Sequence, residues 1–292
     1  MNLLVFDVGG TSVKYSLWQN NQLTTTNHFS SPATWQDLKA ELVAVKEKFS
    51  LTTTLNGVAF SIPGAVVKET GIVAGDSALP YIHHFPIQTE LEAVFGLPVT
   101  LENDAKCAAI AEKWQGAAQN KEEVLFVIIG TGIGGAIFAN NQLCYGAHLH
   151  AGEFGYMILN SKGQGFSELS SPVQMAKRYC EQKGIPTETH SGKDVFAFAK
   201  EGDKVAVREV ELFYDYTAIG LYNLLISVDP EIIVIGGGVS ANPEIVAELE
   251  KRVNKLLQKV AITDFTARVV PCQFGNDANL IGAVKNFIDQ HQ

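Results

Sequence analysis

The 292-residue sequence has no excess of basic residues, no close cysteine pairs and no long apolar run. Its 22 Lys and Arg face 31 Asp and Glu, and the formal net charge of -9 argues against nucleic acid or an anionic membrane as the main partner. No window reaches transmembrane length, and an apolar stretch at residues 3–6 stands where a leader would carry basic residues. We therefore expect a cytoplasmic protein with no membrane partner.

The four cysteines are too far apart in the sequence to suggest a shared structure. Cys107, Cys144, Cys180 and Cys272 show neither the close pairing of a disulfide framework nor the Cys/His spacing of a zinc site. They are typical of reduced cytosolic thiols. We expect no structural zinc.

Hydrophobic residues make up 46% of the chain and charged residues 18%, which is ordinary for a packed globular protein. Apolar strand patterns alternate with helical patterns, which predicts the α/β class. The helical spacing is clearest over residues 35–49, 105–114 and 205–225, and a further helix is predicted over 167–179. The region from the Pro-Gly turn at 63–64 to Pro86 is predicted to be a loop.

Two stretches repeat each other at a distance of 120 residues. Residues 5–23 align without a gap on residues 125–143, with seven identities in nineteen positions. Each copy has an apolar strand, a Gly-Thr turn, a second strand and an Asn-Asn turn, which is typical of a β-hairpin continued into a meander. The repeat therefore indicates a structural duplication.

The Gly-Thr turns suggest a function as well as a fold. Glycine lets backbone N–H groups approach a phosphate closely, and the threonine hydroxyl adds a donor. Two such turns facing one cleft would suit a nucleotide polyphosphate. The alternative is that Gly9-Gly10 and Gly134-Gly135 only permit tight hairpins.

Polar residues follow two other predicted strands. Residues 57–62 form an apolar strand that ends in Pro63-Gly64, and Glu102-Asn103-Asp104 lies between a strand at 98–101 and the helix from 105. One of Asn103 and Asp104 is expected to cap that helix. Asp104 could also accept the proton of an attacking hydroxyl.

Two further stretches carry candidate ligand contacts. Residues 146–156 contain two His and one Glu, for which a substrate contact or a surface loop is favoured over a metal site. Residues 232–239 read as a buried strand running into three glycines, which could lie flat against a ring or a ribose phosphate. The three glycines lack the spacing of the dinucleotide-binding fingerprint.

Taken together, these motifs resemble the ROK family (repressors, open reading frames and sugar kinases), which has the duplicated, actin-like ATPase fold. The resemblance covers nearly the whole chain, and the motifs come in the family's order. They are Asp7-Val8-Gly9-Gly10-Thr11, Ser61-Ile62-Pro63-Gly64, Glu102-Asn103-Asp104-Ala105, Gly130-Thr131-Gly132-Ile133-Gly134-Gly135, Ala151-Gly152-Glu153-Phe154-Gly155 and Ile235-Gly236-Gly237-Gly238.

The resemblance implies an actin-like (ribonuclease H-like) α/β fold with two lobes and an active-site cleft between them. The smaller lobe would comprise residues 1–118 and about 279–292, and the larger lobe residues 119–278. The last helix, about Asn279 to Gln290, would return to the first lobe. A homodimer is implied as well.

The resemblance also implies a role for each motif residue. Asp7 would organise Mg²⁺ delivered with ATP, and Asp104 would be the general base. The residues implied to surround the ATP phosphates are Gly9, Gly10, Thr11, Gly130, Thr131 and Gly132. Those implied to line the adenosine pocket are Gly236, Gly237 and Gly238. Those implied to bind the sugar or line its pocket are Gly64, Asn103, Asp104, Glu153 and Glu168.

Three departures from the family pattern bear on these expectations. Tyr156 stands where many members have a His that touches the sugar, so the identity of the sugar stays open. No cysteine cluster follows it near residues 160–168, which agrees with the expected lack of zinc. Lys106 replaces the Asn that usually follows Asn-Asp-Ala.

The resulting hypothesis is an ATP-dependent kinase that phosphorylates the 6-hydroxyl of a hexose or hexose derivative such as glucose or N-acetylmannosamine. A β-glucoside or fructose kinase is the alternative within the same class. A non-catalytic sugar-binding regulator would be expected to lack the base, whereas Asp7 and Asp104 are both present. A repressor would need a DNA-binding domain, for which the six residues before Asp7 leave no room.

Overall fold

The computed structural model describes residues 1–291 and divides the chain into two compact units. Unit 1 contains Met1–Gly116, Ala147–Leu149 and the segment that starts at Asn276; unit 2 contains Ala117–Gly146 and His150–Gly275. Each unit combines one main β-sheet with helices, which confirms the α/β class. Within residues 1–291, no helix is both long and apolar enough to cross a membrane.

The main sheet of unit 1 has the strand order β3-β2-β1-β5-β8, and β4 also pairs with β2. Strands β1, β5 and β8 are parallel, whereas β2 is antiparallel to β1. The bounds are β1 Leu3–Val8, β2 Ser12–Gln19, β3 Gln22–Leu23, β4 Asn27–Ser30, β5 Gly57–Ile62 and β8 Val99–Asn103.

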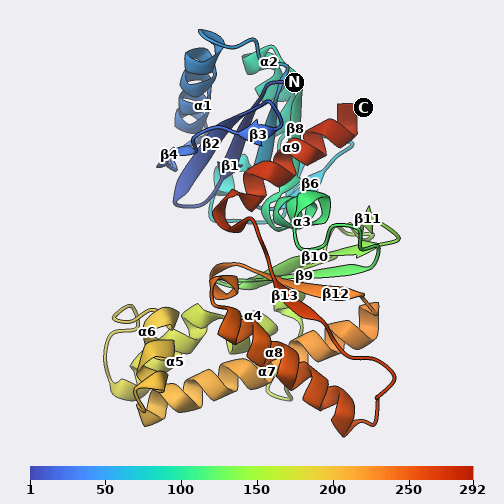
Figure 1. Cartoon of the computed structure of the whole chain (residues 1–292). Helices are drawn as coiled ribbons and strands as arrows, with labels where there is room; N and C mark the ends of the chain where they lie inside the picture. Colours follow the sequence, from blue (N-terminus) through green and yellow to red (C-terminus); the bar gives the residue numbers. More distant parts are fainter. Residues whose placement is uncertain (292) are drawn as a thin grey trace. The chain divides into compact units, whose positions relative to one another are not determined.

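The alternation of side chains along β1 builds two cores, one on each face of this sheet. Leu4 and Phe6 pack with helices α1 (Trp35–Ser50) and α2 (Ile87–Phe95). Leu3 and Val5 pack with α3 (Asp104–Gln115) and α9 (Ala278–His291) on the other face. The C-terminal helix α9 therefore belongs to the same unit as the N-terminal strands (Figure 1).

The sequence predicted a loop up to Pro86, but the structure has a small hairpin there. Strands β6 (Ala65–Val67) and β7 (Ile72–Ala74) pair antiparallel, and a short 3-10 helix, η1, follows at Pro80–Ile82. Val66 and Val73 are buried in the core of unit 1. The strands are only three residues long, too short for a clear alternating pattern in the sequence.

The sheet of unit 2 repeats the order of the first sheet, with strands β11-β10-β9-β12-β13. Their bounds are β9 Val124–Ile129, β10 Ile133–Ala139, β11 Gln142–Leu143, β12 Ile232–Gly236 and β13 Val269–Pro271. The Asn-Asn turns match in detail: Asn20 and Asn21 have φ of 53° and 61°, and Asn140 and Asn141 have φ of 51° and 64°. Both hairpins thus use the left-handed turn that Asn tolerates.

Helices pack on the sheet of unit 2 around one large hydrophobic core. The sequence predicted one helix over 167–179, which is wrong: α4 ends at Ser170 and α5 begins at Pro172. Ser171 has the extended backbone of an N-cap, and its hydroxyl accepts from Gln174 N. The bounds are α4 Phe166–Ser170, α5 Pro172–Lys183, α6 Gly192–Lys200, α7 Lys204–Val228 and α8 Pro243–Lys259.

Candidate active site

In unit 1, Asp7 lies near the end of the buried strand β1, and its neighbours hold its carboxylate in place. Ser61 Oγ (2.8 Å) and Asn279 Nδ2 (2.9 Å) both donate to Oδ1. Lys14 Nζ is 3.8 Å from Oδ2. The pairing of β1 with β2 and β5 places Lys14 and Ser61 opposite Asp7, so three elements fix this acid.

The first Gly-Thr turn follows directly and is exposed at Gly10 and Thr11. Gly9 N donates to Ser12 O (3.0 Å), which closes the turn. A Cβ on Gly10 would come within 2.7 Å of Ala78 Cβ, so the loop after β7 packs directly on this turn. Glycine at this position therefore serves packing as well as any phosphate contact.

The structure shows which of Asn103 and Asp104 caps the helix. Asn103 is the N-cap of α3, because its Oδ1 accepts from Lys106 N (3.1 Å). The same side chain donates from Nδ2 to Gly64 O (3.0 Å). Asp104 is the first residue of α3, and its Oδ1 accepts from Ala105 N (2.8 Å).

Gly64 is confined by neighbours that leave no room for a side chain. Its φ is 98°, and a Cβ would come within 2.7 Å of both His83 Cε1 and Val73 Cγ1. His83 is buried and hydrogen-bonds through Nε2 with Ser77 Oγ (2.7 Å). Burial, reinforced by the adjacent His84, lowers the pKa of His83, which favours a neutral ring behind Gly64.

Acidic residues also surround the buried thiol of Cys107 on α3. Burial raises the pKa of Cys107 well above its usual range, and Glu102, Asp7 and Asp104 raise it further. The thiol is therefore protonated at neutral pH and is not a nucleophile. Lys106, the departure from the family pattern, is buried in the first turn of the same helix.

In unit 2, the second Gly-Thr turn joins β9 to β10. Gly130 N donates to Gly132 O (2.9 Å), and Ile133 N donates to Ser167 Oγ (2.8 Å). Thr131 and Gly132 are exposed. The turn therefore matches the first one in its place between two antiparallel strands.

Glu153 lies in a loop that packs very closely on β10. A Cβ on Gly152 would meet Gly135 O at 2.2 Å, and one on Gly155 would meet Ile133 O at 2.3 Å. Phe154 is buried between them in the chain, whereas Glu153 is exposed. The glycines of this motif thus bring the backbone against the strand and leave the carboxylate on the surface.

Glu168 is exposed in the first turn of α4 and has two supporting contacts. Gln164 Nε2 donates to its Oε1 (2.6 Å), and Arg178 Nη1 donates to its backbone carbonyl (2.8 Å). Arg178 is also paired with the buried Glu209. No sequence pattern pointed to Arg178, because it lies ten residues from Glu168 in another helix.

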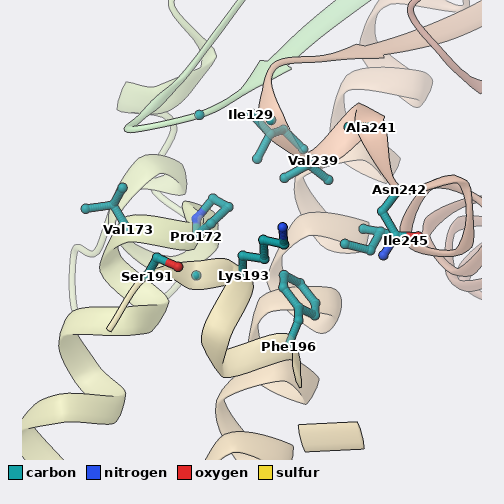
Figure 2. A pocket seen from close by; sticks show the side chains of 13 residues that line it. Ile129, Pro172, Val173, Ser191, Lys193, Phe196, Val239, Ala241, Asn242 and Ile245 are labelled. Carbon is teal, nitrogen blue, oxygen red and sulfur yellow. The ribbon is translucent and has the colours of Figure 1, made fainter. Parts of the chain in front are cut away.

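A pocket of about 490 Å³ in unit 2 contains two of the predicted cofactor residues, Gly130 and Gly238. Figure 2 shows Pro172, Lys193 and Phe196 on one side and Val239, Asn242 and Ile245 on the other. Apolar walls with a few polar groups suit a flat ring. Gly236 and Gly237 are not among its lining residues; a Cβ on either would collide with Ile128 or Ile129 of β9.

Most of the residues that line this pocket were not predicted from the sequence to bind a ligand. Ser191, Gly192, Lys193 and Phe196 come from the start of α6, where Ser191 and Asp194 form a capping box. A capping box marks where a helix begins but does not show what lies beside it. In the sequence these residues indicate only the start of a helix. The fold brings them next to Gly130 and Gly238.

The donors present suit a magnesium ion that arrives with a nucleotide. Mg²⁺ prefers oxygen ligands and is commonly held by one or two carboxylates, several waters and substrate phosphates. Asp7 supplies one fixed carboxylate next to an exposed turn. No cluster of three or more His, Cys, Asp or Glu side chains suited to a metal ion occurs in residues 1–291.

Three known proteins resemble this chain over nearly its full length. The β-glucoside kinase of Listeria monocytogenes is 35% identical, with 99% of this chain and 98% of the relative covered. The structure of a ROK family protein from Streptococcus pneumoniae in complex with sucrose has a TM-score of 0.90 and 32% identity, with 100% and 99% covered. A ROK family glucokinase from Streptomyces griseus, in complex with glucose and AMPPNP, has a TM-score of 0.81 and 25% identity, with 98% and 99% covered.

These similarities confirm the actin-like ATPase fold that the motifs implied. The duplication in this fold is visible as the repeated hairpin and the matching strand order of the two sheets. The model of the ROK family matches residues 4–290. This chain therefore belongs to the ROK family.

Proposed function

We propose that this protein is an ATP-dependent sugar kinase that transfers the γ-phosphate of ATP to the 6-hydroxyl of a β-glucoside. The kinase class is supported by membership of the ROK family and by similarity to sugar kinases over the whole chain. The observation that carries the choice of acceptor is the 35% identity to a β-glucoside kinase across 99% of this chain. The sucrose complex of the similar Streptococcus pneumoniae protein also favours an acceptor larger than one hexose.

In this proposal the nucleotide base occupies the pocket beside Gly130 and Gly238. Phe196, Val239 and Ile245 offer apolar contacts to a flat ring there. Gly9 to Thr11 and Gly130 to Gly132 bind the phosphates through exposed turns. Mg²⁺ bound with ATP would be held beside Asp7 and would neutralise phosphate charge.

Asp104 is the proposed general base. The 6-hydroxyl oxygen forms a bond to the γ-phosphorus, the bond from that phosphorus to the bridging oxygen breaks, and ADP leaves with the electron pair. The hydroxyl proton goes to the carboxylate of Asp104. Phosphoryl transfer depends chiefly on positioning and charge neutralisation, so one carboxylate within hydrogen-bond reach is a sufficient base.

The remaining sugar contacts follow the family pattern. Asn103 and Asp104 would bind hydroxyls of the acceptor, and Gly64 would line the pocket that His83 supports from behind. Glu153 and Glu168 would bind hydroxyls near the anomeric end. Both carboxylates are exposed in unit 2, as a ligand contact requires.

The test is release of ADP with Mg-ATP and a panel of glucose, N-acetylmannosamine, mannose, fructose and cellobiose. We expect the highest kcat/KM with cellobiose, and a loss of at least about a hundredfold in turnover for Asp104→Asn. Asparagine retains an oxygen that can accept from Ala105 N, so this variant should fold normally. Asp289→Asn, on the exposed side of α9, is the matched control and should keep wild-type turnover.

Three results would each contradict one part of the proposal. Wild-type-like turnover by Asp104→Asn would show that Asp104 is not the general base. Absence of ADP release with every sugar would contradict the proposed kinase activity. A sole response to glucose would move the acceptor to the free hexose and leave the kinase class standing.

A further inference from the structure

Two large apolar side chains, Tyr156 and Ile158, stand out on the surface of unit 2. Tyr156 is 79% exposed and Ile158 is 61% exposed. Apolar side chains exposed singly are ordinary, whereas larger exposed apolar patches rimmed by polar residues mark binding sites. Tyr156 and Ile158 lie two residues apart in the chain, and both are largely exposed. We call Tyr156 and Ile158 the apolar pair.

The packing of the segment explains why the pair faces outward. Successive side chains of an extended segment point to opposite sides. Met157 and Leu159 pack against the core of unit 2, so Ile158, between them, faces the other way. Tyr156 is the last residue of the short 3-10 helix η2 (Phe154–Tyr156), in which Phe154 is the buried residue. Ile158 is bridged to Gly165, which has no side chain to cover it. Folding therefore gains little from the size of either exposed residue.

A chain of hydrogen bonds runs to Glu168 from the loop that the bridge between Ile158 and Gly165 closes. Asn160 Nδ2 donates to Gln164 Oε1 (3.0 Å), and Gln164 Nε2 donates to Glu168 Oε1 (2.6 Å). Asn160 Oδ1 also accepts from Lys162 N and Gln164 N, which fixes the loop tip. The loop that carries Ile158 thus also positions one of the carboxylates assigned to the sugar.

Tyr156 is bonded through its backbone to Glu153, the residue that bears the other assigned carboxylate. Tyr156 N donates to Glu153 O (3.3 Å), and Phe154 anchors the intervening residues in the core. Glu153 and Tyr156 therefore belong to one rigid turn, which packs on β10 through Gly152 and Gly155. The apolar pair lies in the chain between the two carboxylates that the proposed function places near the anomeric carbon.

We propose that Tyr156 and Ile158 bind the aglycone of the acceptor, the group attached to the anomeric carbon, and thereby select β-glucosides over free hexoses. This inference rests on the proposed function, in which Glu153 and Glu168 bind the neighbouring hydroxyls. A glycosidic substituent has to extend beyond those hydroxyls. A tyrosine ring offers a flat face to a second sugar ring or an aryl group, and Ile158 adds apolar area.

The experiment compares kcat/KM for phenyl β-glucoside and for glucose, in the wild type and in variants of the pair. We expect the ratio of the two values to fall about fivefold to tenfold in Tyr156→Ala, as loss of one aromatic contact predicts. Tyr156→Phe should keep the ratio within about twofold, because the ring face remains. Phe265→Ala removes another exposed aromatic side chain of unit 2 and serves as the control, with an unchanged ratio.

Binding measured by calorimetry without ATP separates this inference from the kinase assignment. If the wild type releases no ADP with any sugar, the proposed function fails, and the ratio of the two dissociation constants still tests the pair. An equal loss for phenyl β-glucoside and glucose would overturn the inference, because Tyr156 would then contact the hexose itself. A change in molar mass by light scattering with an unchanged ratio would also overturn it and would assign the pair to contact between two copies of the chain.

Discussion

The side chain of Asn103 makes two hydrogen bonds that serve different ends. Its oxygen caps α3, and its amide donates to Gly64 O on the loop that follows β5. Most N-cap side chains satisfy only the helix. Here the cap also fixes the position of a proposed sugar-pocket residue relative to the start of the helix that carries Asp104.

This double role can be separated by substitution. Asn103→Ser keeps a hydroxyl that can cap the helix but loses the amide. Both the bond to Gly64 and the proposed contact of Asn103 with the sugar are then lost, so we expect a higher KM for the sugar with little loss of stability. Asn103→Ala loses both bonds, and unfolding in urea should show a loss of about 1–3 kcal/mol. Thr34→Ala removes the cap of α1 and should lower stability without changing KM. An unaltered KM in Asn103→Ser would show that the bond to Gly64 is dispensable.

Residue type alone could not show which of Asn103 and Asp104 caps α3. Both are good N-caps, so the sequence predicted a cap at this junction without saying which residue provides it. Gly236 is a different case. The family motif predicts that it lines the adenosine pocket, which stays a prediction, and the structure shows it buried against Ile128. A motif identifies a backbone position, whereas the packing around it decides what that position touches.

Among the elements, the hairpins were the most predictable part of the chain. The 120-residue repeat and its Asn-Asn turns are local patterns, and local patterns specify strands and tight turns directly. The break between α4 and α5 was missed because Ser171 and Pro172 follow one apolar helical pattern and precede another. The walls of the pocket near Gly238 were missed because they combine helix starts and loops distant in the chain.

One exposed carboxylate connects the start of β12 to the segment before β9. Glu231 accepts from Lys121 Nζ (2.9 Å), Glu122 N (2.7 Å) and Glu123 N (3.4 Å). Its bond from Lys121, followed by that from Glu122 N, lowers its pKa from 4.5 to about 2. These bonds hold two parallel strands of unit 2 in register at their first residues.

The lowered pKa predicts how stability depends on pH. Because the folded-state pKa lies below the unfolded value, Glu231 stabilises the fold above about pH 4.5, and this contribution is lost as the pH falls towards 2. The difference in urea midpoint between the wild type and Glu231→Gln should therefore shrink steadily from pH 5 to pH 2.5. A constant difference over this range would mean that Glu231 acts through something other than its charge.

For the whole molecule, the duplication has a consequence for nucleotide binding. Each unit contains a Gly-Thr turn in an equivalent hairpin, and the pocket proposed for the base lies in unit 2 alone. The base and the phosphates should therefore affect different parts of the chain. Nucleotides that differ in the number of phosphates can separate the two contributions.

Amide hydrogen exchange provides the measurement. AMP should slow exchange in residues 191–196 and 238–245, which border the pocket, and leave residues 9–11 unchanged. Mg-AMPPNP should slow exchange at these pocket segments and also at residues 9–11 and 130–132, because backbone N–H groups bound to phosphate are protected. Tripolyphosphate, which has no base, should protect the two turns only. Protection of residues 9–11 by AMP, or none at residues 191–196 with any nucleotide, would contradict the proposed contacts of the base and of the phosphates.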